Sequence, residues 1–210
     1  VEATGDQRKP GGSAAAAAAT ESQALTVRAP TRSSISAETE EELWRMKHVV
    51  LQNPLHLPSR LELAEFLAYQ VEDLDAADEE YDKAVELAER NEDEEGKTHV
   101  LCSRANFLFM QLGNFTGAES CYREALELHP RDVTLCYNLG LMLDSQQRFK
   151  DAERMYKRAL RIDPLHAPTL VNYAVLLQEE HGDLEQAEAL YRTLLSSSSS
   201  PPVTALVNYG

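Results

Sequence analysis

The sequence contains few cysteines and no long apolar run. Its three cysteines, Cys102, Cys121 and Cys136, include no Cys-x-x-Cys pair, so neither a zinc site nor a redox motif is indicated. No segment approaches the ~20 apolar residues of a membrane helix. A Gly-rich phosphate loop and the common catalytic motifs are also missing. We therefore expect no enzymatic activity, no cofactor, no metal ion and no membrane partner.

Positive charge is also scarce: 20 lysines and arginines stand against 35 acidic residues. Residues 36–98 contain 19 acidic and 6 basic residues, whereas residues 99–210 contain 13 and 10. Nucleic-acid phosphates require clustered basic residues, so no nucleic-acid partner is expected. The acidic half favours a basic protein segment as partner, although a solvated face that keeps the protein soluble explains it too. Neither acidic segment, 73–78 or 91–96, has the complete ligand pattern of a calcium loop.

Residues 1–35 are rich in Ala, Ser and Gly and poor in apolar residues, which predicts a disordered tail. No signal peptide is visible, so a cytoplasmic location, or alternatively a nuclear one, is expected. The sequence lacks an initiator Met and ends inside a repeated pattern. Both features indicate a fragment.

A spacing of 34 residues repeats in the second half of the chain. Ala118, Tyr122, Ala125, Leu126 and Pro130 recur as Ala152, Tyr156, Ala159, Leu160 and Pro164. Such a unit buries its apolar face by stacking on its neighbours. Matching positions predict a leading helix and linker (36–57), a divergent acidic unit (58–98), units at 99–132, 133–166 and 167–202, the last with a Ser/Pro-rich end, and a truncated unit (203–210).

Each unit is predicted to consist of two helices. Apolar residues of the first half follow a helical stripe, as at Cys136, Leu139 and Leu143. Gly113, Gln147 and Gly182 mark the turn within a unit, and the prolines end the second helices. The extra residue in the third unit is assigned to the turn at 181–183, and the surplus of the 41-residue step from Ala77 to Ala118 is assigned to the loop at 91–96. The fold class is therefore all-α.

The unit resembles the tetratricopeptide repeat, on Cys136, Leu139, Gly140, Leu143, Ala152, Tyr156, Ala159 and Pro164. The resemblance implies antiparallel helix pairs stacked into a right-handed superhelical solenoid, with the first helices lining a concave groove. One departure is Asn106, where the close helix crossing expects a small residue such as Gly140. Either that crossing is looser or Asn106 reaches a neighbouring carbonyl.

The same resemblance implies which residues line the groove. This predicted groove set comprises Ser103, Arg104, Phe107, Met110, Tyr137, Asn138, Leu141, Asp144, Val171, Asn172, Val175 and Gln178. Asn138, Asn172 and Asn208 form a ladder able to hydrogen-bond a peptide backbone. Alternatively, Phe107, Leu141 and Val175 pack on the next helix pair.

Three functions are compatible with these features. The leading hypothesis is a non-enzymatic scaffold that binds peptide or helical segments of partner proteins in the groove. One alternative is the substrate-recruiting arm of a larger enzyme, as in glycosyltransferases that carry such repeats. The other is a cargo or assembly adaptor of the kinesin light chain type, suggested by the 41-residue step and the acidic residues 94–99.

Overall fold

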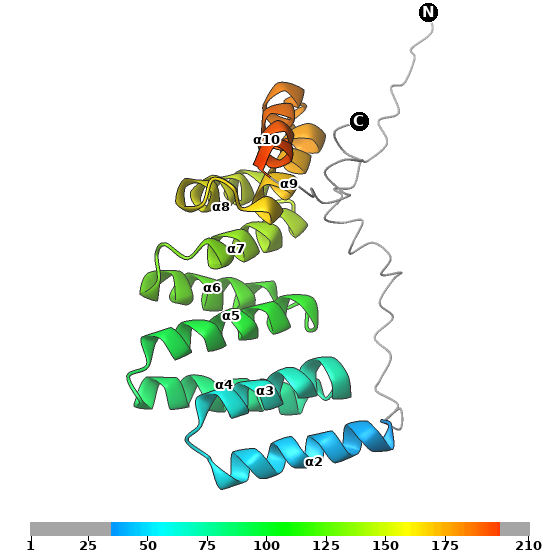
Figure 1. The fold of residues 1–210 in the computed structure, drawn as a ribbon, viewed down its shortest axis with the longest axis vertical. Helices are drawn as coiled ribbons and strands as arrows, with labels where there is room; N and C mark the ends of the chain where they lie inside the picture. The colour runs from blue at the N-terminus through cyan, green and yellow to red at the C-terminus, as the bar shows by residue number, and fades with distance from the viewer. Residues whose placement is uncertain (1–34, 198–210) are drawn as a thin grey trace, which may run out of the picture.

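The computed structural model describes residues 35–197, and its helices stack in chain order from one end to the other (Figure 1). The α-helices in this range are α2 (Ala37–Gln52), α3 (Leu57–Phe66), α4 (Leu74–Arg90), α5 (Glu94–Met110), α6 (Phe115–Leu128), α7 (Val133–Ser145), α8 (Phe149–Ile162), α9 (Ala167–Leu176) and α10 (Leu184–Ser197). Two short π-helical turns, η1 (Leu67–Val71) and η2 (Leu177–His181), extend α3 and α9. The predicted tail, except its last residue, and the truncated unit at 203–210 lie outside the described residues.

The helices pair as antiparallel hairpins: α3 with α4, α5 with α6, α7 with α8, and α9 with α10. Each second helix also packs against the first helix of the next hairpin. No strand occurs between residues 35 and 197. The predicted fold class, an all-α right-handed superhelical solenoid of antiparallel helix pairs, is confirmed.

The repeated tyrosine of each second helix is the largest side chain in the core. Tyr81, Tyr122, Tyr156 and Tyr191 are all fully or almost fully buried between the helices of their hairpins. Small residues such as Ala118 and Ala152, both with no exposed surface, let the helices approach closely around these rings. The sequence repeat thus places one buried tyrosine ring in each hairpin.

Side-chain caps begin most of the helices. The carboxylates of Asp73, Asp93 and Asp132 accept hydrogen bonds from backbone N–H groups three residues ahead, at 3.2, 2.8 and 2.9 Å. Asn114 caps α6 in the same way, at 3.0 Å. Such caps satisfy N–H groups that the first helical turn leaves without a partner.

Within residues 35–197, no cluster of three His, Cys, Asp or Glu residues is placed to hold a metal ion.

The long 41-residue step is taken up by helices and not by a loop. Both α4 and α5 contain 17 residues, compared with 14 in α6 and 13 in α7. The expectation that the surplus lies in a turn at 91–96 is therefore wrong, because Asp93 caps a helix that begins at Glu94. Among the added residues, Ala88 and Thr98 are buried and extend the core at this point.

The first and last hairpins share features that the two central ones lack. His56 and His166 precede α3 and α9, and their Nδ1 atoms hydrogen-bond the hydroxyls of Ser59 and Thr169 at 2.8 and 2.7 Å. Both first helices have Pro in their first turn and end in a π turn followed by a residue with positive φ. The extra residue near Gly182, predicted to lie in a turn, is absorbed by η2, since a π turn contains one residue more than an α turn.

Candidate functional site

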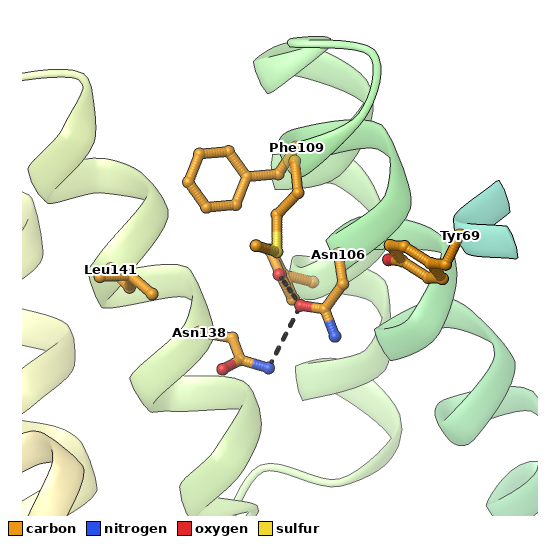
Figure 2. A pocket seen from close by; sticks show the side chains of 7 residues that line it. Tyr69, Asn106, Phe109, Asn138 and Leu141 are labelled. Carbon is orange, nitrogen blue, oxygen red and sulfur yellow. Dashed lines mark hydrogen bonds between the residues drawn. The ribbon is translucent and has the colours of Figure 1, made fainter. Parts of the chain in front are cut away.

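A pocket of about 330 Å³ opens on the face formed by the first helices. Figure 2 shows it between η1, which contributes Tyr69, and α5 and α7. Its lining consists of Tyr69, Asn106, Phe109, Met110, Tyr122, Asn138 and Leu141. Most of this surface is apolar, and two carboxamides and two phenol groups supply the polar atoms. Such a combination suits an apolar side chain whose backbone is hydrogen-bonded nearby.

Asn106 organises the polar part of the pocket. Its amide oxygen accepts a hydrogen bond from the Tyr122 hydroxyl at 2.5 Å and one from the Asn138 amide nitrogen at 3.4 Å (Figure 2). Asn106 therefore binds side chains and not the neighbouring carbonyl that the sequence suggested. Its polar group costs little here because it has partners from two other helices.

The equivalent crossing in the next hairpin leaves no room for such a side chain. A Cβ atom added to Gly140 would lie 2.7 Å from the Tyr156 ring. In that hairpin the Tyr156 hydroxyl reaches Asp144 instead, at 3.3 Å. Residue size at the crossing thus decides where the tyrosine hydroxyl finds its partner.

The pocket walls remain uncharged at neutral pH. Burial raises the pKa of the Tyr122 hydroxyl far above its ordinary value, and burial together with nearby Glu65 raises the pKa of Tyr69. Burial also raises the pKa of the adjacent Cys102 thiol to about 11. An ion placed among these groups would lose hydration without gaining a counter-ion. The pocket therefore fits a neutral group.

Three members of the predicted groove set, Met110, Asn138 and Leu141, line this pocket. Met110 is 68% exposed and offers the most accessible apolar surface of the three. Two other members contact the preceding hairpin. The Ser103 hydroxyl donates to Glu65 at 2.9 Å, and the Arg104 guanidinium pairs with Asp78 and Asp82 at 3.1 and 2.7 Å.

Phe107, Asp144 and Val175 belong to the core and not to the groove surface. They are 0%, 5% and 4% exposed. Phe107 packs against Tyr81 of the preceding hairpin, with ring centroids 5.1 Å apart, whereas the alternative expectation was the next helix pair. Burial raises the pKa of the Asp144 carboxyl to about 6. Val175 packs within α9, against the same core.

The asparagine ladder connects successive first helices. Asn138 donates to Asn106 and, at 3.7 Å, to the Cys102 sulfur on α5. Asn172 donates to the Tyr137 hydroxyl on α7 at 3.1 Å. Asn208 lies outside the described residues. The remaining members of the groove set are half-buried Val171 and exposed Gln178, which lie beyond the pocket on α9 and η2.

Comparison with known families decides the identity of the fold unit. Two family models described as tetratricopeptide repeat match residues 108–167 and 143–207. Residues 108–207 of the chain are thus tetratricopeptide repeats. Proteins of this family generally act as non-enzymatic scaffolds for other proteins. No curated protein matches the chain in sequence.

Several solved structures share the tetratricopeptide repeat fold of the chain. BtubC from P. vanneervenii superposes with a TM-score of 0.67 at 17% identity, over 86% of this chain and 82% of that one. PilF of Pseudomonas aeruginosa gives 0.64 at 22% identity, over 80% and 72%. PilW, described as a type IV pilus biogenesis factor, gives 0.65 at 19% identity, over 80% and 74%. At these identities the likeness concerns the fold alone.

The tetratricopeptide repeat positions did not predict four of the residues that line the pocket: Tyr69, Asn106, Phe109 and Tyr122. The exceptional Asn at the helix crossing was the one available signal. Tyr69 belongs to a π turn, whose extra residue shifts it out of the register on which position counting relies.

No helix among residues 35–197 is long and apolar enough to cross a membrane.

Proposed function

We propose that the protein is a scaffold that binds an extended or helical segment of a partner protein on its concave face. The pocket between η1, α5 and α7 receives one apolar side chain of that segment. The observation that carries this proposal is a 330 Å³ apolar pocket, floored by hydrogen-bonded amides, on the face formed by the first helices.

Polar atoms at the pocket are available for the backbone of the bound segment. Among residues 35–197, the Asn106 amide nitrogen and the Asn138 amide oxygen make no hydrogen bond. They provide one donor and one acceptor at the pocket, the two kinds of group that a peptide unit requires. Because the Asn106 amide is fixed by Tyr122, little side-chain freedom is lost when a ligand binds.

Charge selects what surrounds the apolar anchor. The pocket itself is neutral, whereas residues 36–98 carry 19 acidic side chains against 6 basic ones. We therefore propose that basic residues flank the anchor of the partner segment, attracted by this acidic end of the stack. The cytoplasmic location stays a prediction.

Selection from a random-peptide display library tests the site. Burying a leucine-sized side chain contributes about 1.5–3 kcal/mol, so Leu141→Arg, which fills the pocket with charge, should weaken selected peptides by roughly 10- to 100-fold. Leu112→Arg is the matched control, since Leu112 is an exposed leucine (43%) that does not line the pocket. Equal binding of the selected peptides to wild type and Leu141→Arg would reject the pocket as the binding site.

A further inference from the structure

The outer face of α2 carries an exposed apolar ridge. Trp44 is 66% exposed, Leu51 75% and Leu55, just beyond the helix, 62%. The Trp44 indole stacks on the His48 ring at a centroid distance of 5.2 Å. Spacings of four and three residues place Trp44, His48 and Leu51 along one side of the helix. Leu51 also borders a hollow of about 550 Å³ between α2, α3 and α4.

Two residues of this ridge, Trp44 and Leu51, occupy positions that are polar on comparable helices. The turn that leaves α2 is the one that leaves α6 and α8: the residue after each helix donates its N–H to the carbonyl four residues back, at 2.9–3.0 Å. These residues are Asn53, His129 and Asp163. Counting back from them, the position of Trp44 is Ser120 on α6 and Arg154 on α8, and the position of Leu51 is Glu127 and Arg161.

The apolar ridge therefore cannot be a general requirement of the stack. On α6 and α8 the same positions face solvent with polar side chains and the fold is the same. Exposed large apolar groups that lie together mark interaction sites more often than isolated ones do. α2 is also the terminal helix of the described stack, so no further hairpin among residues 35–197 covers it.

Charges beside the ridge are arranged in two opposite halves. Glu40 and Glu41 precede Trp44 by four and three residues, and Lys47 and His48 follow it by three and four. In two antiparallel copies of α2 that cross at Trp44, a residue before Trp44 on one copy faces a residue after Trp44 on the other. Glu41 then faces Lys47 of the second copy, and Glu40 faces His48. Ala37 faces Leu51, a small residue against a large one.

We propose that this ridge is a homodimer interface in which the α2 helices of two copies of the chain pack antiparallel around Trp44. The charge pattern selects a second copy as the occupant, because acidic and basic halves complement each other only when the helices run in opposite directions. No residue of the ridge lines the first-helix pocket, so the proposed interface and the pocket use separate side chains.

Trp44 is the single tryptophan of the chain, which makes the interface directly observable. The mass of the full chain, measured by light scattering after size-exclusion chromatography over a range of concentrations, should rise from one copy to two. Tryptophan emission should shift to shorter wavelength, and acrylamide quenching should weaken, over the same concentration range.

Leu51→Glu should raise the concentration at which dimers form at least tenfold. Leu165→Glu is the control, because Leu165 is 55% exposed in the corresponding turn after α8 and should leave dimerisation unchanged. Glu41→Lys and Lys47→Glu should each weaken the dimer, and the two substitutions together should restore it.

Four outcomes would overturn the proposal. They are a monomer at every concentration, an unchanged dimer in Leu51→Glu, no rescue by the double charge reversal, and a monomer whose Trp44 becomes accessible only after residues 1–34 are removed. The last result would assign the ridge to the chain's own N-terminal segment. Far-UV circular dichroism of each variant shows that the helices are retained, so a loss of dimer is not a loss of fold.

Discussion

Replacing the buried tyrosines by phenylalanine, one hairpin at a time, should change stability in opposite directions at equivalent positions. Tyr122 donates to Asn106 at 2.5 Å, whereas the buried Tyr81 hydroxyl has no hydrogen-bond partner among residues 35–197. Both rings are fully buried, and the substitution removes one oxygen atom in each case. The surrounding packing is left nearly the same, so the hydrogen bond is the variable.

The expected difference follows from these contacts. Tyr122→Phe loses a hydrogen bond and leaves the Asn106 oxygen with only its 3.4 Å bond to Asn138, a loss of about 1–1.5 kcal/mol. Tyr81→Phe removes a polar group that is desolvated without compensation, a gain of up to about 1 kcal/mol. The two variants should thus differ by about 2 kcal/mol, roughly a 30-fold difference in the folding equilibrium constant.

Urea unfolding followed by far-UV circular dichroism measures this difference. With an m-value of about 2 kcal/mol/M, the two midpoints should lie about 1 M apart, on either side of wild type. Equal m-values are needed for the comparison, since stacked repeats can unfold in steps. If Tyr81→Phe lowers the midpoint as much as Tyr122→Phe does, the hydrogen bond to Asn106 does not explain the stability of that crossing.

Two further substitutions test the hairpin of α7 and α8. Burial raises the pKa of Asp144 to about 6, above its unfolded value near 3.9, so stability should fall as the pH rises from about 4 to 6 and stay lower above it. Asp144→Asn should remove this loss of stability, which amounts to at most about 3 kcal/mol. Thermal unfolding at pH 4 and pH 8 measures it. If the variant still loses stability between these two pH values, the pH dependence belongs to other groups. Gly140→Ala places a Cβ 2.7 Å from the buried Tyr156 ring and should destabilise by about 1–2 kcal/mol after the gain in helix propensity, as chemical denaturation would measure. A stability equal to or above that of wild type would mean that α8 shifts at no cost.

The fold was predictable from the sequence because one buried tyrosine per hairpin recurs, with spacings of 41, 34 and 35 residues. The same counting placed Asn138 and Leu141 at the pocket. It failed for Phe107, which folds back on Tyr81 of the preceding hairpin. It failed again for Asp144, which turns inward to the Tyr156 hydroxyl. The orientation of Phe107 depends on the preceding hairpin and that of Asp144 on the second helix of its own hairpin. A repeat pattern averages over such individual contacts.

The π turn at Leu67–Val71 shows how a repeat protein can acquire a distinctive groove at little cost to its framework. The π turn contains the additional residue within its five positions, so α4 still packs against α5. Tyr69, which lies in this turn, forms part of the pocket wall. Insertions at this point change the wall of the pocket and leave the packing of the buried tyrosines unchanged. Relatives of this chain are therefore best aligned on their buried tyrosines, with gaps opened at the ends of the first helices.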